Sequence, residues 1–185
     1  MGTDYSDEEL MLKYRRGDAA AFEVLYQRHK GGVFRYIVRQ CHNESLSEEL
    51  FQDVWMNLIN ARQRYEIKAR FTTWLYQIAR NRVIDHFRRQ NKQGYDRSDA
   101  GNSNVDQIPS HYQDQPDQRV EIQDRTERLL RLIDALPAEQ KETFLLREEA
   151  GMSIAEIAET TGVNAETAKS RLRYAVNKLR AELLE

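Results

Sequence analysis

The clearest structural motif of this chain lies in residues 153–184, SIAEIAETTGVNAETAKSRLRYAVNKLRAELL. Ile154 and Ile157 fall on one face of a short helix when successive residues are projected at about 100°. Gly162 then marks a turn, and Asn164 suits the N-cap of a longer second helix. A short helix, a glycine turn and a longer helix together predict a helix-turn-helix unit.

The second of these helices separates apolar from basic side chains. Its apolar side chains fall within about 100° of arc, the width of one buried stripe, and are Ala168, Leu172, Ala175, Val176, Leu179 and Leu183. The outer face carries Lys169, Ser170, Arg173, Asn177 and Arg180, with Glu166 and Thr167 at the N-terminal end. A recognition helix enters the major groove in this way, with its N-terminal residues toward the base edges. A charged outer face on one helix is usually only solvated, so the preceding helix and glycine turn are what favour DNA binding.

The remaining sequence also predicts helices. Apolar residues recur at intervals of three and four, and no strand-like alternation is present. The predicted N-caps are Ser6 and Ser153, each with a glutamate three residues later, together with Asp18 and Ser47. The fold class predicted is therefore all-α.

Composition divides the chain into three segments. Residues 1–92 have helical periods and carry 16 basic against 12 acidic side chains. Residues 93–118 are rich in Gly, Ser, Asn, Asp, Gln and Pro, with 1 basic against 5 acidic side chains, and are predicted to be a flexible linker. Residues 119–185 form the C-terminal helical domain, with 11 basic against 13 acidic side chains. The total charge of −2 hides any local basic surface.

Two helices of the first domain have polar faces. In FTTWLYQIARNRVIDHFRR, residues 71–89, a row of Gln77, Asn81, Asp85 and Arg88 with Trp74 at its edge lies apart from the core stripe. Such a row can hydrogen-bond to and stack on unpaired bases; a core tryptophan beside a solvated face is the other interpretation. In SEELFQDVWMNLI, residues 47–59, acidic groups and a methionine face outward and suit a basic surface of a protein partner: Glu49, Gln52, Asp53 and Met56.

Several function classes are excluded. Cys41 is the single cysteine, so no intramolecular disulfide is possible, and no Cys/His set has zinc-site spacing. No secretory signal and no run of roughly 20 apolar residues is present, so a cytoplasmic protein without membrane insertion is expected. No nucleophile–base pair, phosphate-binding glycine loop or metal-ligand set occurs, so we expect neither catalysis nor a cofactor.

These motifs occur in one order: SEELFQDVW, FTTWLYQIARNRVIDHFRR, the acidic linker, LPAEQKETFLLRE and the helix-turn-helix. The combination resembles the extracytoplasmic-function group of the sigma-70 family, the sigma factors of bacterial RNA polymerase, over nearly all the chain. In that family the first domain docks on the clamp coiled coil of the β′ subunit and melts the −10 element. The second domain reads the −35 element and contacts the flap of the β subunit. The resemblance implies core RNA polymerase, promoter DNA and an anti-sigma factor as partners.

The resemblance also implies site residues. The docking residues are Glu48, Glu49, Gln52 and Asp53, beside Met56. The −10 residues are Tyr65, Lys68, Arg70, Trp74, Gln77, Asn81, Arg82, Asp85, Arg88 and Arg89. The −35 residues are Glu166, Thr167, Lys169, Ser170, Arg171, Arg173 and Tyr174.

Two other functions explain part of the sequence. A helix-turn-helix repressor or activator that binds operator DNA by itself accounts for residues 153–180 but leaves the polar faces of the first domain unexplained. A helical adaptor that binds only protein would show no salt-dependent affinity for DNA. The acidic linker either imitates a nucleic-acid backbone or is a simple tether.

Overall fold

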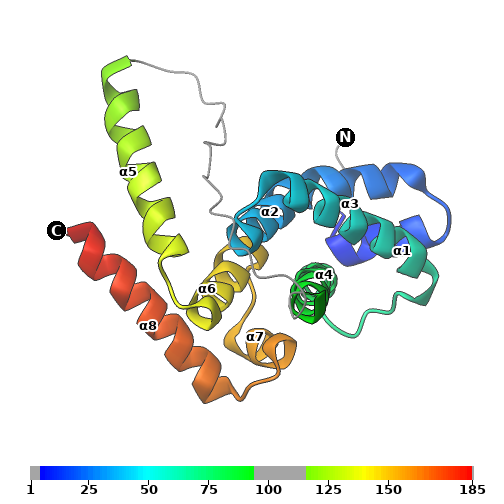
Figure 1. Cartoon of the computed structure of the whole chain (residues 1–185). Helices are drawn as coiled ribbons and strands as arrows, with labels where there is room; N and C mark the ends of the chain where they lie inside the picture. The colour runs from blue at the N-terminus through cyan, green and yellow to red at the C-terminus, as the bar shows by residue number, and fades with distance from the viewer. Residues whose placement is uncertain (1–4, 94–115, 185) are drawn as a thin grey trace.

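The computed structural model describes residues 5–93 and 116–184 of the chain, and both ranges are helical, as predicted. Figure 1 shows the arrangement. The first range contains α1 (Asp7–Arg15), α2 (Ala19–Cys41), α3 (Glu44–Ala61), the short 3₁₀ helix η1 (Arg62–Arg64) and α4 (Phe71–Gln93). The second contains α5 (Pro116–Asp134), α6 (Ala138–Ala150), α7 (Ile154–Thr161) and α8 (Ala165–Leu184).

Helices α1 to α4 pack around one apolar core. Helix α2 packs on both α1 and α3, and α3 packs on α4. The core stripe predicted on α4 is Phe71, Leu75, Ile78 and Ala79; Phe71, Leu75 and Ala79 are fully buried, whereas Ile78 is only half-buried. This packing fixes how α3 and α4 lie against each other, and their outer faces are the candidate interfaces.

Helices α7 and α8 form the helix-turn-helix unit, α6 packs on both of them, and α5 packs on α8. Ile157 on α7 and Ala168 and Ala175 on α8 are buried, and Gly162 ends α7 with a left-handed φ of 72°. Figure 1 shows α5 reaching away from the rest of the molecule. The buried stripe of α8 ends before Leu183, which was predicted to belong to it and is 42% exposed.

The predicted N-caps are confirmed with one exception. Ser6 and Ser153 form capping boxes, and Asp18 accepts from the first turn of α2. Ser47 was predicted to cap α3, and this is wrong. Asn43 caps α3 by accepting from the Leu46 amide at 2.9 Å, and Ser47 lies buried one turn inside the helix.

The chain between α2 and α3 explains this difference. His42 ends α2 in the left-handed region with φ 51°, so one residue, Asn43, is left before α3 begins. The Ser47 hydroxyl then donates to the Asn43 carbonyl at 2.6 Å. The segment predicted as linker is also shorter at its C-terminal end, because α5 begins at Pro116; residues 94–115 lie outside the described residues.

Replacing Asn43 with Ala should lower the free energy of unfolding by about 1 kcal/mol, because the first-turn amides of α3 lose their acceptor. Urea unfolding followed by tryptophan fluorescence measures this domain, since both tryptophans, Trp55 and Trp74, lie in it. The exposed Ser45→Ala is the control and should change stability by less than about 0.5 kcal/mol. Equal effects of the two substitutions would contradict the cap assignment.

Candidate nucleic-acid interface

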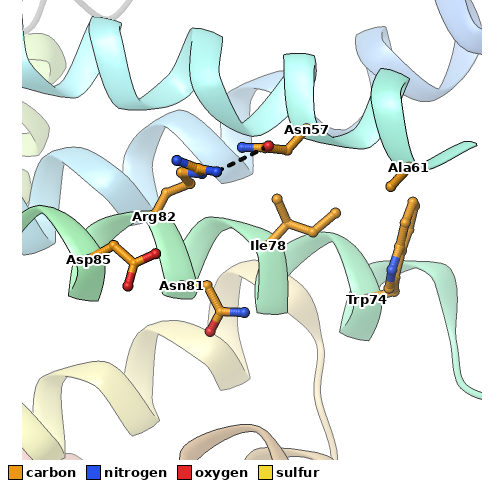
Figure 2. Close-up of a pocket in the computed structure, with 7 residues that line it drawn as sticks. All are labelled: Asn57, Ala61, Trp74, Ile78, Asn81, Arg82 and Asp85. Carbon is orange, nitrogen blue, oxygen red and sulfur yellow. Dashed lines mark hydrogen bonds between the residues drawn. The ribbon is translucent and has the colours of Figure 1, made fainter.

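A cavity of about 320 Å³ lies between α3 and α4. Figure 2 shows Arg82 reaching from α4 to Asn57 on α3, with Trp74 beside Ala61 at one end and Asp85 at the other. The Arg82 guanidinium donates to the Asn57 side-chain oxygen at 3.1 Å. The full lining is Asn57, Ala61, Trp74, Ile78, Asn81, Arg82 and Asp85.

The periodicity of α4 produces this cavity. Trp74, Ile78, Asn81 and Asp85 follow one another at helical spacing and form a stripe beside the buried core stripe. The core stripe anchors the helix, so the second stripe is presented along a fixed line. An indole, amides, a carboxylate and a guanidinium around one cavity can stack on a base and hydrogen-bond to its edges.

Tyr65 supports this cavity from behind, although the resemblance placed it among residues that contact DNA. Its side chain is buried, at 2% exposure, and its ring lies 4.9 Å from the Trp74 ring, centroid to centroid. Burial, with the nearby carboxylates of Glu8 and Asp7, raises the pKa of Tyr65 to about 12. In this conformation Tyr65 packs against the indole and does not face solvent, and its assignment to the −10 element stays a prediction.

The other residues assigned to the −10 element occupy several environments. Lys68 is exposed and pairs with Glu66 at 2.7 Å. The Arg70 guanidinium donates to the carbonyl of Gly151 in the second domain at 2.9 Å. The exposed outer side of α4 carries Gln77, Asn81, Arg88 and Arg89.

The outer face of α3 is as predicted. Glu48, Glu49, Gln52 and Met56 are exposed, and Met56 is 54% exposed. Asp53 is half-buried at the edge nearer α4, where its carbonyl accepts from the Asn57 side chain at 2.8 Å. One helix therefore contributes both the acidic face and one wall of the cavity.

The recognition helix α8 begins at the predicted cap, because the Thr167 amide donates to Asn164 at 2.7 Å. Its exposed residues include Glu166, Lys169, Arg173 and Tyr174, and the Arg173 guanidinium lies 5.3 Å from the centre of the Tyr174 ring. Thr167, Ser170 and Arg171 are half-buried. The Arg171 guanidinium lies 2.5 Å from the Glu139 carboxylate of α6 and is thereby oriented along the helix surface.

The two domains contact each other through polar side chains. Arg35 on α2 forms a forked ion pair with Glu149, with a shortest distance of 2.7 Å. Arg39 pairs with Asp134 at 3.0 Å and Arg80 with Glu142 at 2.9 Å. These pairs could not be predicted from the sequence, because contacts between residues about 60 to 115 positions apart leave no periodic signal.

Further contacts lie on either side of these pairs. The Thr73 hydroxyl donates to Glu156 at 2.6 Å, and the Tyr76 hydroxyl donates to the Glu149 carbonyl at 3.0 Å. A Cβ on Gly32 would lie 2.6 Å from the Tyr76 hydroxyl. Glycine at position 32 therefore leaves the space through which Tyr76 reaches the second domain.

His42 and Lys141 close one end of this interface. The Lys141 amine lies 2.8 Å from His42 Nε2, and Lys141 is only 7% exposed. Burial, and then the Lys141 charge, lower the pKa of His42, which also faces Asp134 and Arg39. Neutral His42, with Nε2 unprotonated, accepts a hydrogen bond from the Lys141 ammonium, whereas protonated His42 would place two cations in contact.

This arrangement predicts a pH dependence of domain closure. The pKa of His42 in this interface is lower than the ordinary 6.5, so a proton would bind His42 better if the two domains separated. The contribution of His42 to contact between the domains should be largest well above about pH 6.5 and should weaken as the pH falls through and below that value. Small-angle scattering should show a larger radius of gyration at pH 5.5 than at pH 7.5.

The variant His42→Asn should remove much of this change, because Asn tolerates the left-handed cap and does not titrate. His86→Gln, a substitution on α4, is the matched control and should keep the change. An unaltered pH response in His42→Asn would show that another group titrates.

Two further observations concern the described residues alone. None of the helices within residues 5–93 and 116–184 has the length and apolar character needed to span a bilayer. The same ranges contain no group of three or more side chains that could hold a metal ion.

Comparison with known proteins identifies both domains. Residues 25–93 match the family model "Sigma-70 region 2", and residues 126–179 match "Sigma-70, region 4". The chain is 31% identical over 174 residues to the RNA polymerase sigma factor CarQ of Myxococcus xanthus, covering 94% of this chain and 95% of CarQ. It is 26% identical to the RNA polymerase sigma-H factor of Pseudomonas aeruginosa, covering 100% of this chain and 98% of that protein.

Solved structures share the fold. The sigma factor RpoE of Bartonella quintana, in complex with the anti-sigma factor NepR, superposes with a TM-score of 0.71 at 22% identity, covering 88% of this chain and 96% of RpoE. CnrH, in complex with the cytosolic domain of CnrY, superposes with a TM-score of 0.65 at 21% identity, covering 96% of both chains. The chain belongs to the sigma-70 family of RNA polymerase sigma factors, in its extracytoplasmic-function group.

Proposed function

We propose that this chain binds core RNA polymerase through the outer face of α3, opens the −10 element with the cavity between α3 and α4, and reads the −35 element with α8. The observation that carries the proposal is the cavity itself. It combines the Trp74 indole with polar groups on a domain that matches sigma region 2. The polymerase performs the catalysis.

The energetics of base capture fit this cavity. Extruding a base costs a few kcal/mol, and stacking on an aromatic side chain returns roughly 1–3 kcal/mol. Asn81 and Asp85 at the cavity edge can add hydrogen bonds to the captured base. The Tyr65 ring behind Trp74 reduces the freedom that the indole would lose on binding.

The exposed side of α8 carries side chains suited to contacting both bases and phosphates. Lys169 and Arg173 are exposed on one side of the helix, one turn apart. A lysine amine lacks the rigid fork with which arginine recognises guanine, so Arg173 is the better candidate for a bidentate base contact. We assign Arg171, which pairs with Glu139 in the free chain, to a phosphate contact.

The closed arrangement of the two domains cannot serve both promoter elements. Elements named −10 and −35 lie roughly 25 base pairs apart, or about 85 Å at about 3.4 Å per base pair. A compact chain of 185 residues has a radius of gyration of about 16 Å. We infer that core polymerase binds the chain in an open form, and that an anti-sigma factor, as found with RpoE, favours an inactive form.

Run-off transcription tests the function directly. Bacterial core polymerase is supplied with a genomic promoter library, with and without this protein. New, discrete start sites that share two spaced upstream elements are the expected result. No new starts, together with operator binding by the protein alone, would favour the repressor or activator.

Two variants, one single and one double, should separate docking from promoter reading. Asp53→Arg reverses the charge at the α3 face and should weaken core binding at least 10-fold, whereas Lys169→Ala with Arg173→Ala should spare core binding and abolish specific initiation. Core affinity is measured by fluorescence anisotropy and initiation by run-off. Unchanged core affinity in Asp53→Arg would remove the docking assignment.

The base cavity has its own test. Asn81→Ala removes a hydrogen-bonding group worth about 1 kcal/mol or more and should lower run-off from duplex promoters about 5- to 10-fold. The defect should shrink on a template with a pre-opened −10 region, because the melting cost is then absent. Asn60→Ala, exposed on α3 outside the cavity, is the control. A defect of equal size on both templates would contradict base capture.

A further inference from the structure

The first domain presents a face of hydrogen-bond donors to the second domain. We name this the donor face, and it consists of Arg35, Arg39, Arg70, Thr73, Tyr76 and Arg80. Opposite it lie the carboxylates of Asp134, Glu142, Glu149 and Glu156 and the carbonyls of Glu149 and Gly151. The contact from Lys141 to His42 runs the other way. The donor face is therefore matched to a surface of acceptors.

A nucleic-acid backbone is a surface of this kind, because phosphate oxygens accept hydrogen bonds and carry negative charge. The donor face has the side chains that recognise phosphate: the arginine guanidinium forks, and hydroxyls. The forked contact of Arg35 with Glu149 has the geometry that a guanidinium also forms with a phosphate. Arg35 remains 61% exposed even in the closed state.

The donor face is continuous with the polar row proposed to contact the −10 element. On α4, Arg80 precedes Asn81 in the sequence and lies one turn from Gln77. Arg80 points to Glu142 in the second domain, whereas Gln77 and Asn81 are exposed beside it. A duplex that enters along the polar row would therefore bring its backbone over Arg80 and then over α2, once the second domain has moved away.

We propose that the donor face is a second DNA-binding surface, specific for the sugar-phosphate backbone of promoter duplex, and that the acidic face of the second domain covers it as an internal stand-in for DNA. This inference rests on the proposed function. In the closed chain the carboxylates occupy the arginines. In the open chain, bound to polymerase, the same arginines bind phosphates and add salt-dependent affinity without sequence preference.

The test compares the two sides of the same contacts. One double variant removes donors, Arg35→Gln with Arg80→Gln, and the other removes their acceptors, Glu149→Gln with Glu142→Gln. Each is assembled with core polymerase, and its affinity for a promoter fragment that gives a start in run-off transcription is measured over a series of salt concentrations. Circular dichroism checks that both variants keep their helices.

The donor-side variant should reduce the slope of log affinity against log salt by about 1.8, since each lost phosphate contact accounts for about 0.9. The acceptor-side variant should leave the slope of the holoenzyme unchanged, because in the open state those carboxylates face solvent. Both variants break the same interdomain ion pairs, so the difference between them isolates DNA binding from closure.

Two results would overturn the proposal. If the two variants give the same slope, the donor face serves closure alone. If the donor-side variant weakens core binding and leaves the salt slope unchanged, the occupant is an acidic surface of the polymerase and not DNA. The wild-type chain must give starts in the same assay; their absence would count against the proposed function and not against the donor face in particular.

Discussion

Arginines of α2 and α4 face carboxylates of the second domain across one polar interface, and the working arrangement of this chain depends on that contact. Ion pairs that are partly exposed contribute only about 0–1 kcal/mol each, because solvation of the separated charges competes with the pair. Arg39 and Arg80 are largely covered, but Arg35 is 61% exposed. The contacts are therefore specific in geometry and modest in free energy, which suits the interface that we propose, closed in the free protein and open on polymerase.

Helix α4 explains how one small domain can do several things at once. Its periodicity places the core stripe on one side, the cavity residues on the next and the interdomain residues on a third. Phe71 and Tyr76 are buried for different reasons, the first in the core and the second under α6, where it passes Gly32. In the open form that we propose, the interdomain residues of α4 become exposed, while the core stripe and the cavity residues keep their surroundings.

Features set by local sequence could be predicted, and those set by contacts over long distances could not. The all-α class, the helix-turn-helix and most N-caps follow from spacing and capping chemistry within a few residues. Ser47 was misassigned because the left-handed turn at His42 decides where α3 begins. The burial of Tyr65 could not be predicted from its neighbours in the sequence, because it depends on packing against Trp74 and Phe71. The ion pairs between the domains join helices that no periodicity connects.

Energy transfer between dyes on the two domains measures how far apart the domains lie, and so tests whether the chain is closed when free and open on polymerase. Cysteines for the dyes replace the exposed residues Asn60 on α3 and Glu159 on α7, with Cys41→Ser to avoid labelling the native thiol. We expect high transfer in the free protein and a large fall when core polymerase is added, in a labelled chain that still supports run-off transcription. High transfer that persists in an active holoenzyme would contradict it.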